Sequence, residues 1–172
     1  IPAEVTRIAP NVFQENKTIK MVNTNAVTEV GEFAFDGCSA LESVEMPEVK
    51  IIGQRAFRSC VNVASIDMPK IEQIGDVAFH ANNQMVEIVL PTSLQKFGSG
   101  ALSSCLKLTT ITVADDHPHF TSVGGVLYDK EMKIILAYGR GLTATTYEAP
   151  PTVTTVGGLS FMGVTALTSV KL

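Results

Sequence analysis

The sequence contains little of what nucleic-acid-binding or membrane-spanning proteins need. Tryptophan is absent, and aromatic residues make up only 6% of the 172 residues. Charged residues amount to 17% with a net charge of −4, so no basic surface for nucleic acid is expected. No apolar run approaches the length of a membrane span, and the first residues lack the basic and apolar regions of a signal peptide.

Catalytic motifs are also missing. The chain has no G-x-S-x-G elbow, no H-E-x-x-H pair and no phosphate-binding loop. We therefore expect no enzymatic activity and no cofactor. His117 and His119 adjoin Asp115 and Asp116, and this set could in principle bind a divalent ion. A solvated polar loop is the interpretation we prefer, so no metal is expected; His80 has no partner within sequence reach.

What the sequence does contain is a repeat of about 22 residues. Apolar marker residues recur at intervals of 22, 22, 22 and 23 residues, and a further copy follows later in the chain. The markers are Ile8, Val30, Ile52, Ile74, Phe97 and Val156. A repeat of this length predicts a solenoid, in which each unit buries its apolar face against its neighbours. The 45% hydrophobic content supports one domain over residues 1–172.

The first half of each unit has the spacing of a short helix. Glycine follows the marker in five copies, a small residue stands four positions after it, and phenylalanine stands five positions after it in most copies. The phenylalanines are Phe13, Phe35, Phe57, Phe79 and Phe161. Apolar residues at positions zero, four, five and eight predict one face of a helix or helical turn. The phenylalanine rings would then stack as a ladder inside the solenoid, and the glycines would permit close approach of neighbouring backbones.

The three cysteines follow the same repeat. Cys38, Cys60 and Cys105 all stand eight residues after a marker, where other copies carry Asn16 and Asn82. A position that accepts these residue types predicts a small buried slot rather than a disulfide framework.

The second half of each unit has the alternation of a strand. Apolar residues such as Val44 and Met46 alternate with polar ones, and a proline such as Pro47 ends the run. We therefore predict an α/β solenoid with one short parallel strand per repeat of about 22 residues on its concave face.

The motif L-x-x-[IV]-x-[LM]-P-x-x-[IV]-x-x-I-G-x-x-A-F-x-x-C summarises the unit, as in Leu41–Pro47 and Ile52–Cys60. It resembles the BspA-like (Treponema pallidum-type) leucine-rich repeat family over essentially the whole chain. The resemblance implies a right-handed superhelix, a bacterial origin, an extracellular or cell-surface location, and roles such as adhesion to host matrix proteins. A segment at about 114–151 carries the family's F-x-S-x-x-G-V-L-Y signature, and its two apolar runs predict a β-hairpin that elaborates one repeat.

The outward positions of the predicted strands form the candidate binding surface. They are Asn23, Ser43, Glu45, Ser65, Asp67, Glu87, Thr110, Thr112, Ser169 and Lys171. Glu45, Asp67 and Glu87 would form an acidic ladder for a basic or hydroxyl-rich partner, either a protein or a glycan. The alternative is a solvated face that keeps the sheet soluble.

Two functions fit these features. The first is a non-enzymatic surface or secreted protein-interaction module for adhesion or recognition, with no nucleic acid and no membrane-spanning segment involved. The alternative is a structural spacer that presents another domain. Both ends of the sequence fall inside a repeat, so we expect a fragment of a longer array or end-to-end self-association.

Overall fold

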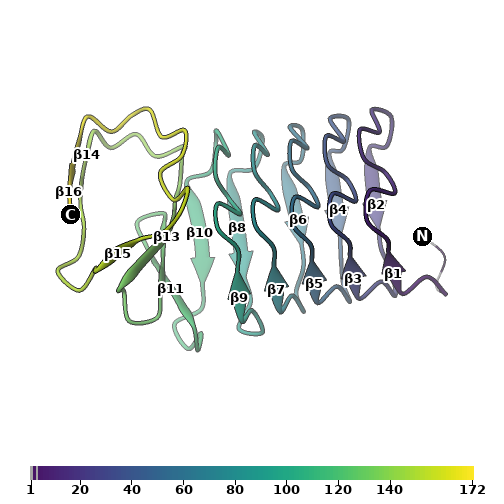
Figure 1. Ribbon diagram of the computed structural model, residues 1–172, viewed down its shortest axis with the longest axis horizontal. Helices are drawn as coiled ribbons and strands as arrows, with labels where there is room; N and C mark the ends of the chain where they lie inside the picture. The colour runs from purple at the N-terminus through teal and green to yellow at the C-terminus, as the bar shows by residue number, and fades with distance from the viewer. Residues whose placement is uncertain (1, 3) are drawn as a thin grey trace.

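The computed structural model describes residues 2 and 4–172 and forms a parallel β-solenoid whose turns stack along its long axis (Figure 1). One side of the turns is a five-stranded parallel sheet in the order β1-β3-β5-β7-β9. Its strands are β1 (Arg7–Ile8), β3 (Glu29–Val30), β5 (Ile51–Ile52), β7 (Gln73–Ile74) and β9 (Lys96–Phe97). The first five predicted markers are thus the second residues of these short strands.

A second side of the turns contains the strands that the sequence alternation predicted. The strands β2 (Met21–Asn23), β4 (Ser43–Glu45) and β6 (Ser65–Asp67) pair in parallel, as do β8 (Glu87–Leu90) and β10 (Thr110–Val113). Each regular turn therefore has two strands, and the expectation of one strand per repeat is wrong. The marker residue starts no helix; it pairs with its neighbour one turn away, as Val30 pairs with Ile52.

The predicted α/β fold class is wrong, because no helix is present in residues 2 and 4–172. The third side of the turns, where the helix was expected, has a different backbone conformation. Residues three and seven positions after the marker have positive φ angles, including Phe33 at 57° and Val77 at 49°. A left-handed residue cannot continue a right-handed helix. The backbone instead makes successive tight turns, in which the Asp36 amide donates to the Phe33 carbonyl at 3.1 Å.

Hydrogen bonds between turns offset this backbone strain. The Phe35 amide donates to the Ala56 carbonyl at 2.8 Å, and the same bond recurs from Phe57 to Ala78 at 2.9 Å. Neighbouring backbones approach so closely that a Cβ atom at Gly75 would lie 2.6 Å from the Gln54 nitrogen. The prediction that glycine permits this approach is confirmed.

The core lies between these three sides. Phe13, Phe35, Phe57 and Phe79 stack with ring centroids 5.0, 5.0 and 5.8 Å apart, which confirms the predicted ladder for these four rings. Phe161 instead stacks on Tyr138 in the C-terminal part, with centroids 5.1 Å apart. All three cysteines are buried and free. The Cys60 thiol donates to the Phe35 carbonyl at 3.1 Å, so the cysteine position is a small buried slot as predicted.

The C-terminal part departs from the regular turns. The strands β11 (Phe120–Val123), β12 (Val126–Asp129) and β13 (Ile134–Tyr138) form an antiparallel meander, and β13 pairs in parallel with β15 (Thr155–Val156). The strand β14 (Thr146–Glu148) pairs in parallel with β16 (Ser169–Lys171). A second, smaller core lies beneath this segment, where Tyr128 and Tyr138 are buried.

Candidate functional site

The outward side chains of β2, β4, β6, β8 and β10 form a strip that we call the outward strand surface. Parallel pairing without offset places equivalent positions side by side, so that Asn23 lies opposite Glu45 and Glu45 lies opposite Asp67. Ser43 and Ser65 are paired in the same way one row away. The sequence therefore predicted correctly which residues of β2, β4 and β6 are neighbours.

The polar centre of the outward strand surface is the carboxylate pair of Glu45 and Asp67. The Asn23 side-chain amide donates to Glu45 Oε2 at 2.7 Å. A shallow hollow of about 300 Å³ lies along β4 and β6 and is lined by Ser43, Glu45, Ser65 and Asp67, with Pro47 at one end. This hollow is small, and its lining combines these four acceptor-bearing side chains with the apolar residues Val44, Ile66 and Pro47.

The predicted acidic ladder is shorter than expected. Glu87 pairs with Thr110, whereas Val89 pairs with Thr112. Glu87 stands thirteen residues after its marker, in the position of Ser43 and Ser65, and the position equivalent to Glu45 is filled by Val89. Two carboxylates, rather than three, therefore lie in one row.

The last two predicted surface residues belong to a different sheet. Ser169 pairs with Thr146, and Lys171 pairs with Glu148. The Lys171 ammonium lies 2.5 Å from Glu148 Oε1, with both side chains largely exposed. The structure therefore groups Asn23, Glu45 and Asp67 but places Ser169 and Lys171 beyond the meander.

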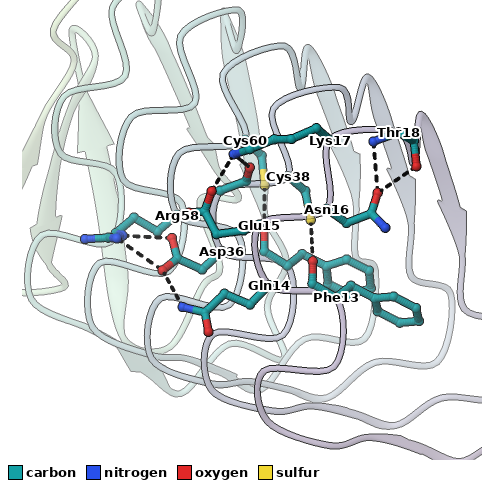
Figure 2. Close-up of polar contacts among 12 residues, drawn as sticks. Phe13, Gln14, Glu15, Asn16, Lys17, Thr18, Asp36, Cys38, Arg58 and Cys60 are labelled. Atoms are coloured by element: carbon teal, nitrogen blue, oxygen red, sulfur yellow. Dashed lines mark hydrogen bonds and ion pairs between the residues drawn. The ribbon is translucent and has the colours of Figure 1, made fainter.

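A second row of polar residues, which the sequence analysis missed, runs along the tight-turn side (Figure 2). Arg58 donates from Nε to Asp36 Oδ1 at 2.8 Å, and Gln14 donates to Asp36 Oδ2 at 3.4 Å. One turn further, His80 Nδ1 lies 2.8 Å from the Ser103 hydroxyl. These residues all stand six positions after a marker, so their shared column in the repeat is the signal that could have found them.

Electrostatics along this row favour a neutral imidazole. Burial, together with the positive charges of Arg58 and Arg55, holds the pKa of His80 below its usual value. Asp36 is almost fully buried and paired. The row therefore connects neighbouring turns through paired side chains.

His117 is the clearest correction to the sequence analysis. It is fully buried, although a solvated loop was expected. Its Nε2 atom lies 3.0 Å from the Pro91 carbonyl oxygen, and its Nδ1 atom accepts hydrogen bonds from the amides of His119 and Phe120 at 3.1 and 3.2 Å. These contacts define Nε2 as the protonated nitrogen, and burial lowers the His117 pKa. The ring positions the loop before β11.

In the described part of the chain, neither a cluster of metal ligands nor an exposed thiol is present. Residues 2 and 4–172 contain no cluster of three histidine, cysteine, aspartate or glutamate residues that could hold a metal ion. Burial raises the pKa of the Cys105 thiol to about 12, so that it stays protonated at neutral pH. Nor do these residues contain a helix that is long and apolar enough to cross a bilayer.

Known proteins share this repeat. The sequence profile described as the BspA type leucine rich repeat region matches six copies over residues 6–128. The chain belongs to the BspA-type leucine-rich repeat family. The family resemblance inferred from the motif is thereby confirmed. No curated protein matches the chain.

Solved structures share the BspA-type fold at low sequence identity. A leucine-rich repeat protein from Bacteroides ovatus is 23% identical with a TM-score of 0.72, over 100% of this chain and 44% of its own. The pneumococcal vaccine antigen PcpA is 20% identical with a TM-score of 0.73, over 96% of this chain and 44% of its own. A leucine rich cell surface protein from Faecalibacterium prausnitzii is 20% identical with a TM-score of 0.58, over 100% of this chain and 68% of its own. This BspA-type chain thus spans less than half the length of the first two.

Proposed function

We propose that this chain is a non-enzymatic protein-interaction module of the bacterial cell surface, which binds a basic partner through Glu45 and Asp67. Membership of the BspA-type family supports an interaction role. The Faecalibacterium prausnitzii protein, which shares the fold, is described as a cell surface protein and supports the location. Adhesion to a host or matrix protein is the form of recognition that we propose.

The observation that supports this proposal most directly is that these two carboxylates lack a neutralising cation within the described residues. In the described part of the chain, neither Glu45 nor Asp67 forms an ion pair. Acidic residues on either side of the same segment do: Lys20 pairs with Glu42 at 3.7 Å, and Lys70 pairs with Glu48 at 2.6 Å. Carboxylates on a rigid sheet that lack a cation of their own are suited to lysine or arginine side chains of a partner.

Paired charge-reversal variants test the proposal. The protein would be applied to an array of purified extracellular-matrix proteins and glycans, at low and at physiological salt. We expect the double variant E45K/D67K to lose binding to basic matrix proteins, and wild-type binding to weaken as salt increases. The control E42K/E48K has the same change in net charge but alters carboxylates that are already paired with lysines.

Equal binding by E45K/D67K and the wild type would eliminate the acidic pair as the site. Loss of binding in both double variants would point to net charge rather than to the hollow between β4 and β6. If the wild type binds no protein or glycan on the array, the spacer function is favoured instead.

A further inference from the structure

The sheet that carries the outward strand surface is interrupted beside the meander. Among residues 2 and 4–172, β10 pairs with no strand but β8, and β14 with no strand but β16. Figure 1 shows β14 and β16 at the C-terminal end of the array, standing apart from β10. In the described residues, the strands of this side are therefore unpaired at two places, between β6 and β8 and again between β10 and β14. The second break is the one that adjoins the meander.

The β14 edge has unused backbone hydrogen-bonding groups. The Ser169 amide donates to the Thr145 carbonyl at 3.2 Å, and the Ala149 amide donates to the Lys171 carbonyl at 2.8 Å. Alternation along a strand then directs the backbone N–H and C=O groups of Thr146 and Glu148 away from β16. Within residues 2 and 4–172, no hydrogen bond to these four groups is present.

The β10 edge differs from the β14 edge in that a side chain bonds to one of its outward backbone groups. Alternation directs the backbone groups of Ile111 away from β8, because the Thr110 amide donates to the Val86 carbonyl at 3.2 Å. The Ser122 hydroxyl donates to the Ile111 carbonyl at 2.6 Å and covers this edge from β11. A side chain thus occupies one acceptor of the β10 edge, whereas no side chain bonds to the outward backbone groups of β14 in the described residues.

An apolar groove of about 450 Å³ adjoins the open edge. Its lining includes Thr146 and Glu148 from the edge itself, together with Val123, Tyr138 and Leu142. Val123 is 57% exposed, which is high for a branched apolar side chain. The rings of Tyr138 and Tyr147 pack edge to face with centroids 5.6 Å apart, so an aromatic wall faces the groove.

We propose that this groove binds an extended peptide segment of a partner protein, which adds to the open edge of β14 as a further strand. The backbone of the peptide would hydrogen-bond to Thr146 and Glu148, and its apolar side chains would enter the groove beside Val123 and Tyr138. A strand edge demands alternating donors and acceptors at peptide spacing, which a glycan or a lipid does not supply. The aromatic wall is typical of an anchor site for a partner side chain.

A display library tests the proposal even though the partner protein is unidentified. Phage-displayed random peptides of about ten residues, long enough for one strand, would be selected on the immobilised chain. We expect enrichment of sequences with alternating apolar residues. A synthetic copy of the enriched peptide should slow amide hydrogen exchange at Thr146 and Glu148.

Matched variants distinguish the groove from the rest of the surface. V123D places a charge in the groove and should weaken peptide binding at least about tenfold, as loss of an interface anchor does. V89D is its control, because Val89 is 58% exposed and lies on β8, outside the groove. A second variant, A144R, adds bulk at an exposed groove position and should also block binding.

The outcomes decide the proposal independently of the acidic pair. Binding that is lost in V123D and A144R but retained in V89D and in E45K/D67K supports the peptide groove. No enrichment, or enriched peptides that bind V123D as tightly as the wild type, overturns it. Thermal unfolding of each variant shows that the lost binding is not lost folding.

Discussion

The Arg58 guanidinium makes two parallel hydrogen bonds to the Asp36 carboxylate, from Nε to Oδ1 at 2.8 Å and from Nη2 to Oδ2 at 3.1 Å. The Asp36 side chain is 1% exposed, whereas that of Arg58 is 37% exposed. The pair joins two neighbouring turns of the solenoid. The buried carboxylate therefore depends on a partially exposed cation for its principal partner.

We expect Arg58→Met to lower the free energy of unfolding by about 2 kcal/mol or more, because it leaves a buried carboxylate with only a long contact to Gln14. Urea denaturation at pH 7 measures the loss. The matched control is Lys70→Met, which removes an exposed ion pair with Glu48 and should change stability by less than about 1 kcal/mol. Similar losses in both variants would contradict the importance of burial.

Asn82 offers a stabilising substitution. Its side chain is fully buried, and neither Oδ1 nor Nδ2 has a hydrogen-bond partner in the described residues. The equivalent Cys60 and Cys105 donate to the carbonyls of Phe35 and Phe79, both at 3.1 Å. We expect Asn82→Cys to raise the free energy of unfolding by about 1–3 kcal/mol, because it removes an unsatisfied buried amide.

The control for this substitution lies at the same repeat position in the first turn. Asn16 Oδ1 accepts hydrogen bonds from the Thr18 and Ile19 amides, both at 2.9 Å. Asn16→Cys should therefore destabilise the protein, by about 1 kcal/mol. Thermal unfolding compares the two, and the same sign of effect at both positions would refute this interpretation of the cysteine slot.

A substitution at Gly75 tests how closely the backbones of neighbouring turns approach. A Cβ atom there would lie 2.6 Å from backbone atoms of Gly53 and Gln54, neither of which can move without shifting a turn. We expect Gly75→Ala to cost about 3 kcal/mol, the upper range for overpacking. Gly124→Ala is the control, since nothing lies within 4 Å of its added Cβ and only the positive φ of 58° opposes it, at about 1 kcal/mol.

Mild acid should destabilise the loop that contains His117. Protonation adds a hydrogen to Nδ1 and abolishes its acceptance of the His119 and Phe120 amides. Because the folded-state pKa is below the unfolded value of about 6.5, this contribution is complete above that pH and is lost as the pH falls through the folded pKa. Unfolding measured between about pH 7.5 and 5 checks the direction.

Substitutions distinguish the contributions of His80 and His117 to the pH dependence of stability. His80 has a lowered pKa as well, so His80→Gln should remove part of the pH dependence without altering the loop. His117→Gln should flatten the profile further and lower stability at pH 7.5, because the buried acceptor is displaced. A profile that is unchanged in His117→Gln would show that this ring does not titrate during unfolding.

The repeat period, the inward residues and the strand register could be predicted from the sequence, since burial recurs at fixed positions. The helix could not be excluded in the same way. Positions zero, four, five and eight are compatible both with a helix and with successive tight turns. The positive φ angles fall on residues such as Phe33, Arg55 and Val77, which disfavour that conformation, and hydrogen bonds between turns override the local preference.

The candidate site was predictable only where the repeat is regular. The pairing of Glu45 with Asp67 follows from their equivalent positions, whereas Glu87 was assigned to the wrong row because its position within the unit differs by two residues. The burial of His117 depends on Pro91, which is distant in sequence, so no local pattern could indicate it. The open edge of β14 arises from the meander and has no signature in the repeat.

The hydrogen bonds that join the turns lie along the long axis of the array, from Phe35 to Ala56 and again from Phe57 to Ala78. A force that pulls the two ends of such a molecule apart acts on all layers of bonds in series, and a terminal turn yields first because it has a neighbouring turn on one side only. In single-molecule extension, the regular turns should therefore detach singly from an end, each releasing about 75 Å of chain for its repeat of about 22 residues. Such a module would act as an extensible tether under tension.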